Sequence, residues 1–160
     1  MGAGKSVVGR ELAAQTNALF VDSDALVEAR EQTEIARIIA NRGVAEFRRR
    51  ETAALREAVE TTENTVLSLG GGAWTMPENR VLLEGFQTVW LAAPFDLCWR
   101  RIVMSKTTRP LAPTRERAEE LFAARGAIYR TAKFQIEICE DQTPAEIAGA
   151  IRNLIAAAGS

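Results

Sequence analysis

The chain has 160 residues, enough for one domain with a buried core, and its apolar (47%) and charged (26%) fractions are ordinary for a globular protein. A net charge of −1 provides no broad basic surface, so we expect neither nucleic acid nor a membrane as a partner. With no histidine, the sequence excludes a Ser-His-Asp triad and histidine base catalysis, and it argues against a structural zinc site.

The cysteines and the apolar segments indicate the cellular location of the protein. Cys98 and Cys139 each lie in an apolar segment, which favours buried thiols in a reducing compartment over a disulfide or a metal pair. The sequence shows no long uninterrupted apolar run and no signal peptide pattern. We therefore expect a cytoplasmic protein.

Strand-like and helical segments alternate along the chain. Strands are predicted at residues 18–21, 65–69, 88–91 and 134–138, and helices at 6–15, 34–41, 44–60, 77–84, 94–104 and 116–130, with a last helix opening at the capping box of Thr143 and Glu146. This alternation predicts a single α/β domain over residues 1–160, with a parallel sheet between two layers of helices. Ligands of such folds bind at the carboxyl ends of the strands.

The chain begins with half of a nucleotide-binding motif. Residues Gly2, Ala3, Gly4, Lys5 and Ser6 match the second half of the phosphate-binding loop G-x-x-x-x-G-K-[ST], in which the lysine reaches the β/γ-phosphates and the serine hydroxyl binds Mg²⁺. A chance glycine-rich N-terminus is the alternative. The first glycine of the motif would lie before Met1, and the loop normally follows a buried strand. We therefore expect the central strand of the sheet to be missing, and the chain to be less stable and less active than one extended at its N-terminus.

Two carboxylates follow the first predicted strand. On an extended backbone, Asp22 and Asp24 would point the same way, toward one pocket. The alternative is that they cap a helix or form a turn, because aspartate is common after strands.

The helix at 44–60 places two opposite charges on its apolar face. Arg48 and Glu51 are one turn apart on the same arc as Phe47 and Leu55, whereas Arg49 and Arg50 project elsewhere and are expected to be solvated. Two interpretations are open: the pair is a buried structural ion pair, or Glu51 orients the Arg48 guanidinium group so that it can bind a carboxylate ligand.

Two further segments are candidates for ligand contact. The glycines Gly70, Gly71 and Gly72 end the strand at 65–69, where they suggest a wall approached closely by a ligand, with a flexible turn as the alternative. Residues 105–115 are polar and basic with two prolines, which is typical of a mobile loop. Taken alone, an arginine of that loop such as Arg109 would be a solvated residue.

Together these segments resemble the shikimate kinases in order and spacing. The resemblance rests on Gly2–Ser6, Asp22–Asp24, Phe47–Glu51, Leu69–Ala73, Thr108–Leu111 and Arg125–Tyr129, and it extends over essentially the whole chain. It implies a three-layer α/β/α P-loop kinase fold of the nucleoside-monophosphate-kinase type. It also implies transfer of the γ-phosphoryl group of ATP to the 3-hydroxyl of shikimate, a step of aromatic amino acid biosynthesis, by an enzyme that is typically monomeric.

The resemblance also implies roles for individual residues. ATP and Mg²⁺ would contact Gly2, Ala3, Gly4, Lys5, Ser6, Val7, Arg109 and Gln142, with Ser6 and Asp22 near the metal. Shikimate would contact Asp24, Arg48, Gly70, Gly71, Gly72 and Arg125, of which Arg48 and Arg125 would hold its carboxylate. The catalytic residues would be Asp24, Lys5 and Arg109, with Asp24 acting as base or orienter of the nucleophile and Arg109 lying in a lid at about 105–115. The substrate-binding helices would span about 34–60.

Four residues, at three places in the chain, depart from the family pattern. Trp74 occupies a position where a smaller residue is usual, and it is expected to narrow the pocket. Ala112 replaces a leucine that is common in the family. Gly126-Ala127 replaces a proline-containing turn, which should loosen the helix at 116–130. Arg125 and Tyr129 could equally be surface cover on that helix. Two other functions remain open: a non-catalytic, kinase-like binding module, and another small-metabolite kinase such as a gluconate kinase.

Overall fold

The computed structural model describes residues 2–159 except 62, 63 and 106–110, and the side chain of residue 61 is also outside the description. In chain order its elements are α1 (Lys5–Thr16), β1 (Leu19–Asp22), α2 (Ser23–Glu31), α3 (Ile35–Thr61), β2 (Thr65–Ser68), the 3₁₀ helix η1 (Ala73–Thr75), α4 (Pro77–Leu82), β3 (Val89–Ala92), α5 (Phe95–Met104), α6 (Arg115–Tyr129), β4 (Phe134–Glu137) and α7 (Pro144–Ala158). The four predicted strands are thus confirmed to within one or two residues. The expected lid falls largely on residues 106–110, outside the described part.

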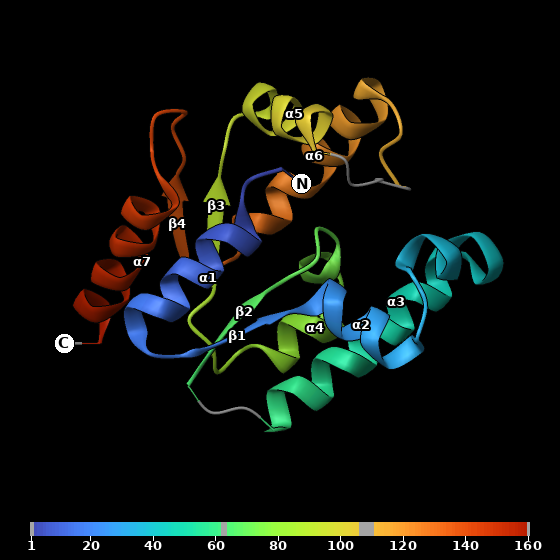
Figure 1. Ribbon diagram of the computed structural model, residues 1–160, viewed down its shortest axis with the longest axis horizontal. Helices are drawn as coiled ribbons and strands as arrows, with labels where there is room; N and C mark the ends of the chain where they lie inside the picture. Colours follow the sequence, from blue (N-terminus) through green and yellow to red (C-terminus); the bar gives the residue numbers. More distant parts are fainter. Residues whose placement is uncertain (1, 62–63, 106–110, 160) are drawn as a thin grey trace.

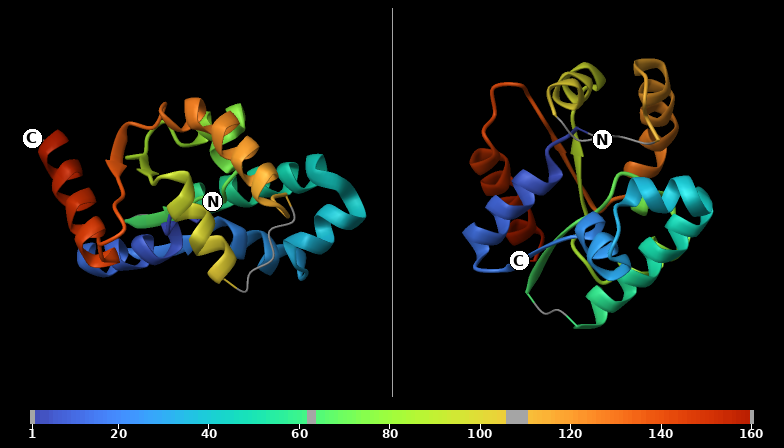
Figure 2. Two further views of the ribbon diagram at one scale, coloured as in Figure 1. Left: turned by 90° about the horizontal axis from the view of Figure 1, so that it is seen from above. Right: turned by 45° about the vertical axis from the view of Figure 1, so that its right-hand side comes forward.

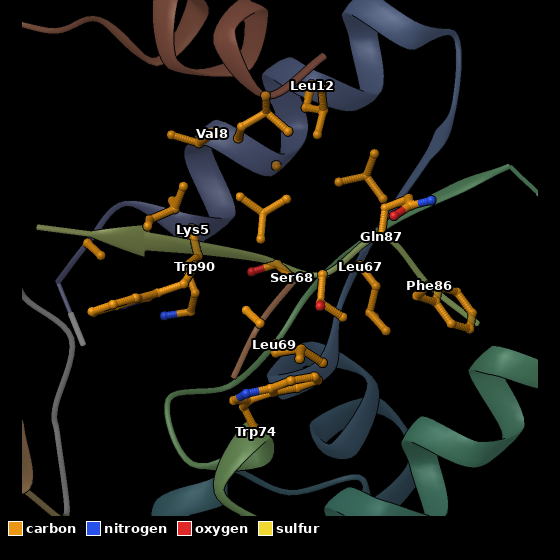
Figure 3. Close-up of a pocket in the computed structure, with 18 of the residues that line it drawn as sticks. Lys5, Val8, Leu12, Leu67, Ser68, Leu69, Trp74, Phe86, Gln87 and Trp90 are labelled. Atoms are coloured by element: carbon orange, nitrogen blue, oxygen red, sulfur yellow. The ribbon is translucent and has the colours of Figure 1, made fainter. Parts of the chain in front are cut away.

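The strands form two parallel pairs. β1 pairs with β2 in the register Leu19 to Thr65, and β3 pairs with β4 in the register Val89 to Phe134. Within the described residues, no strand joins the two pairs. A groove of about 750 Å³ lies between them and is lined from both sides by strand residues, among them Leu67 of β2 and Leu91 of β3. Figure 3 shows some of the side chains that line it.

Helices cover the strands on two sides. In Figure 1, α1 and α7 lie side by side, and α2, α3 and α4 form a second group beyond β1 and β2. Figure 2 shows α5 and α6 in the region of the N-terminus. The main core joins Val8 of α1 to Leu91 and Ile138 near β3 and β4, and to Ile147 and Ile151 of α7. The expected layered α/β arrangement is confirmed.

Local signals fix several element boundaries. Gly43 interrupts α3 with φ 81° and ψ 166°, a conformation that favours glycine, so the predicted break between the helices at 34–41 and 44–60 is confirmed. The capping box of Thr143 and Glu146 is present at the start of α7. Helix α6, by contrast, continues through Gly126 and Ala127, so these residues do not end or break it.

Two expectations about side chains are wrong, and one helix of the structure has no counterpart among the predicted elements. Arg50 is not solvated: it is 21% exposed and pairs with Glu31 and Glu46, which ties α2 to α3. Cys139 is an exposed thiol, because it lies in the turn after β4, whereas Cys98 is buried as expected. Helix α2 was not predicted at all. Among the described helices, none is both long enough and apolar enough to cross a membrane.

Candidate active site

The half-loop at the N-terminus has the backbone conformation that its glycines allow. Gly2 and Gly4 have φ values of 70° and 88°, in the region that favours glycine. A Cβ atom on Gly2 would lie 2.3 Å from the carbonyl oxygen of Cys98, so only glycine fits against α5 at this point. Lys5 and Ser6 then begin α1, whose N-terminus can bind an anion.

Helix α5 holds the other side of this half-loop. Arg101 donates a hydrogen bond from Nη1 to the carbonyl oxygen of Ala3 at 3.4 Å. Burial raises the pKa of the neighbouring Cys98 thiol, and the positive charges of Lys5 and Arg101 act in the opposite direction. Two side-chain cations therefore lie around the half-loop in the described structure. The sequence did not single out Arg101, because nothing local distinguishes it from the adjacent Arg100, which pairs with Glu140.

The first strand ends in a helix cap that also reaches the half-loop. Asp22 Oδ1 accepts a hydrogen bond from the backbone N–H of Asp24 at 3.0 Å, which makes Asp22 the N-cap of α2. Its other oxygen, Oδ2, accepts from the Ser6 hydroxyl at 2.6 Å. The expectation that Asp22 and Asp24 share an extended backbone is therefore wrong: the chain turns into α2 at Ser23, and the two carboxylates have different surroundings.

The three glycines form a turn against which charged side chains pack closely. The backbone N–H of Gly70 donates to the hydroxyl of buried Ser23 at 2.7 Å. A Cβ atom on Gly70 would lie 2.3 Å from Asp24 Oδ1 and 2.8 Å from Glu51 Oε1. A Cβ on Gly72 would lie 2.1 Å from Arg48 Nη2. The glycines thus leave room for charged side chains rather than for turn flexibility alone.

Arg48 and Glu51 face inward and pair, as their spacing predicts. Their side chains are 13% and 1% exposed, and Arg48 Nη1 donates to Glu51 Oε2. Burial raises the pKa of Glu51 and Asp24 adds to that rise, while Arg48 and, more weakly, Arg125 lower it. Glu51 Oε1 is buried and has no hydrogen-bond partner within the described structure, so the carboxylate is only half satisfied.

Helix α6 joins the cluster through its last turns. Tyr129 donates a hydrogen bond from its hydroxyl to the carbonyl oxygen of Gly71. Burial raises the pKa of Tyr129, whereas the charge of Arg125 and a hydrogen bond between the two side chains lower it. Arg125 and Tyr129 are therefore not mere surface cover. The glycine turn, α3 and α6 bring together Asp24, Arg48, Glu51 and Arg125.

The remaining predicted residues lie apart from this cluster or outside the description. Val7 is 55% exposed on the first turns of α1. Gln142, in the turn before α7, accepts a hydrogen bond from the backbone N–H of Cys139 at 2.8 Å. Arg109 lies outside the described residues. Its predicted role is not tested.

Chemically, the site has two adjoining halves. Backbone N–H groups, Lys5 and Arg101 suit a phosphate chain, and the oxygen pair of Ser6 and Asp22 suits a hard divalent cation. The second half contains two arginines for an anion and a carboxylate that can accept a proton or hydrogen bond. The contact between Asp22 and Ser6 joins the halves.

Known proteins match the chain over almost its full length. The family model described as shikimate kinase matches residues 1–156. The shikimate kinase of Synechococcus sp. is 36% identical over 98% of this chain and 84% of its own, and that of Cereibacter sphaeroides is 38% identical over 98% and 79%.

Solved structures agree with the sequence matches. A shikimate kinase from Acinetobacter baumannii in complex with shikimate superposes with a TM-score of 0.90 at 35% identity, covering 99% of this chain and 89% of that one. The enzyme from Bacteroides thetaiotaomicron gives a TM-score of 0.87 at 28% identity, covering 100% and 94%. These matches confirm the P-loop kinase fold that the motifs predicted, and the chain belongs to the shikimate kinase family.

Proposed function

We propose that this protein transfers the γ-phosphoryl group of ATP to the 3-hydroxyl of shikimate, giving shikimate 3-phosphate and ADP. The observation that carries the proposal is the hydrogen bond between Asp22 and Ser6. This hydrogen bond supports the proposal because it joins the half-loop to Asp22, two residues before Asp24 of the charged cluster, so a nucleotide and a carboxylated acceptor would bind side by side. Phosphoryl transfer requires this positioning more than it requires covalent chemistry.

The acceptor half suits a hydroxylated ring that carries a carboxylate. Arg48 and Arg125 would bind the carboxylate, because guanidinium groups pair with carboxylates through parallel hydrogen bonds. Glu51 would hold Arg48 in place from within the core. Asp24 would accept a hydrogen bond from the reacting hydroxyl and orient it, and the backbone of Gly70, Gly71 and Gly72 would contact the other hydroxyls.

The donor half suits the phosphates of ATP. The backbone of Gly2, Ala3 and Gly4 and the ammonium group of Lys5 would surround the phosphate oxygens. Val7 and Gln142 would contact the nucleotide further out. Arg109 would close over the phosphates and neutralise charge in the transition state.

Ser6 and Asp22 fit a magnesium ion. Their oxygens are 2.6 Å apart, and both are hard ligands of the type that Mg²⁺ prefers. When bound, the ion would supply positive charge to the β- and γ-phosphates. Within this chain, Ser6 would bind the ion directly and Asp22 through water, and Asp22 would keep its role as the cap of α2.

A coupled assay tests the proposed function. With MgATP and millimolar shikimate, we expect ADP release together with formation of shikimate 3-phosphate. Gluconate serves as the competing acceptor, because a gluconate kinase is the alternative enzyme. ADP release with gluconate but not with shikimate would disprove the substrate, and binding of both ligands without ADP release would indicate a non-catalytic binding module.

The glycine turn offers a test of the carboxylate site. Gly72→Ala is expected to raise KM for shikimate by roughly tenfold, because the added methyl group displaces Arg48, which buried Glu51 otherwise holds. KM for ATP should change less than twofold. Gly85→Ala is the matched control, since a Cβ there would meet nothing within 4 Å. Equal KM values in the two variants would contradict the role of Arg48.

A monomeric state and a cytoplasmic location are part of the same proposal. The free thiols of Cys98 and Cys139 are compatible with a reducing compartment. Size-exclusion chromatography with light scattering would test the first point.

A further inference from the structure

We propose that Trp74 is a positioning residue for the acceptor site, acting with Tyr129 as a latch that fixes α6, and therefore Arg125, against the glycine turn. This inference rests on the proposed function, since it assigns a consequence for binding of the carboxylated substrate. Trp74 lies in η1, directly after the three glycines and Ala73.

Three hydrogen bonds connect the turn with the C-terminal end of α6, and they run in opposite directions. Tyr129 of α6 donates to the carbonyl oxygen of Gly71. Trp74 donates from Nε1 to the carbonyl oxygen of Ile128 at 3.2 Å and to the Thr131 hydroxyl at 3.2 Å. Because Ile128 and Tyr129 are consecutive, the indole and the phenol hold the same end of the helix from two sides.

The turn side of the latch is itself well anchored. Buried Asn79 of α4 donates to the carbonyl oxygen of Ala73 at 2.9 Å, and Arg80 donates to that of Trp74 at 2.9 Å. The indole therefore extends from a fixed backbone. Trp74 does line the groove, as Figure 3 shows, but its N–H is directed to α6, so the side chain does more than narrow a wall.

The latch matters because the two arginines of the acceptor site are on different elements. Arg48 is on α3, where Glu51 holds it, whereas Arg125 is on α6, one helical turn before Tyr129. Tyr129 contacts both Arg125 and Gly71. Its hydroxyl therefore links Arg125 to the glycine turn, which lies beside Arg48. A carboxylate held by both arginines requires a fixed distance between them.

Trp74→Phe is the principal test, because phenylalanine keeps an aromatic ring and removes the N–H donor. We expect KM for shikimate to rise about 3- to 10-fold, the size of effect that losing one or two hydrogen bonds produces. KM for ATP should stay within twofold and kcat within threefold. Trp99→Phe, on α5 and stacked on Phe95, is the matched control and should leave all three constants unchanged.

A substrate analogue separates positioning from general damage to the fold. With the shikimate carboxylate replaced by a hydroxymethyl group, wild type and Trp74→Phe are expected to have the same KM, because the latch acts through Arg125. Tyr129→Phe should repeat the pattern with a larger rise for shikimate. An equal rise in KM for both acceptors, or no rise at all, would overturn the proposal.

Hydrogen exchange keeps the test independent of the reaction. Amide protons of residues 125–131 should exchange at least threefold faster in Trp74→Phe than in Trp99→Phe. If the wild-type protein did not phosphorylate shikimate, the proposed function would fail, but this measurement would still decide whether the latch exists. Identical exchange in the two variants would disprove it.

Discussion

Asp24→Asn is expected to lower kcat with shikimate by roughly 10²- to 10⁴-fold, the range found for loss of a positioned acid or base. The Asp24 carboxylate lies in the acceptor half of the site, because its Oδ1 packs against Gly70, as Glu51 Oε1 also does. Asparagine has the same size but loses the charge and one acceptor oxygen, so it orients the reacting hydroxyl poorly.

The substitution should leave the fold and the binding of shikimate nearly intact. Asp22, not Asp24, caps α2 with its side chain, and Asp24 contributes only its backbone N–H to that cap. We therefore expect the Tm to change by no more than a few degrees and the Kd for shikimate, from calorimetry, by less than about tenfold. Asp141→Asn, at an exposed turn before α7, is the control and should be fully active. Full activity of Asp24→Asn would disprove the assigned role.

Features encoded by neighbouring residues could be predicted from the sequence. The capping box at Thr143 depends on residues three apart, and the break at Gly43 depends on the conformation of one residue. The inward direction of Arg48 and Glu51 follows from helical periodicity alone. These features needed no knowledge of distant parts of the chain.

Helix α2 shows where local signals were ambiguous. An aspartate after an apolar strand can continue the strand or cap a helix, and both were possible for Asp22. What decides is a set of long-range contacts: Asp22 accepts from Ser6, and Ser23 accepts from Gly70. Neither partner is close in sequence.

The latch and the charges on α3 depend on distant residues in the same way. Nothing near Trp74 indicates that its N–H would bind Ile128, fifty-four positions away. Arg50 looked identical to solvated Arg49 because its partner Glu31 belongs to the helix that was not predicted. Pairings of this kind become visible only when the elements are packed.

The groove between the two parallel pairs is expected to accept an added strand. We expect a segment of five β-branched and leucine residues, followed by a glycine and one further residue and joined before Met1, to enter the groove between β2 and β3. Ala3 lies in the core with Leu91 and Ala93, at the carboxyl end of β3. A strand running into Gly2 would therefore be parallel to β3 and end at the half-loop.

The added strand should stabilise the protein. Burying each large aliphatic side chain contributes roughly 1.5–3 kcal/mol, whereas ordering each residue costs roughly 1–2 kcal/mol, so five residues give a net gain of about 3 kcal/mol. For a protein of this size that corresponds to a rise in Tm of about 10 °C. Calorimetry of the 160-residue chain and the extended chain measures it.

Activity should rise with stability, because the strand would fix the first half of the phosphate-binding loop. We expect kcat/KM for ATP to increase at least tenfold, since an anchored loop holds its N–H groups ready for the phosphates. An extension of equal length made of glycine and serine is the control: it adds chain but no apolar side chains for the groove, and it should change neither the Tm nor kcat/KM. If both extensions behaved like the 160-residue chain, the groove would not accept a strand. The same increase with both would show that added length, not strand insertion, is responsible.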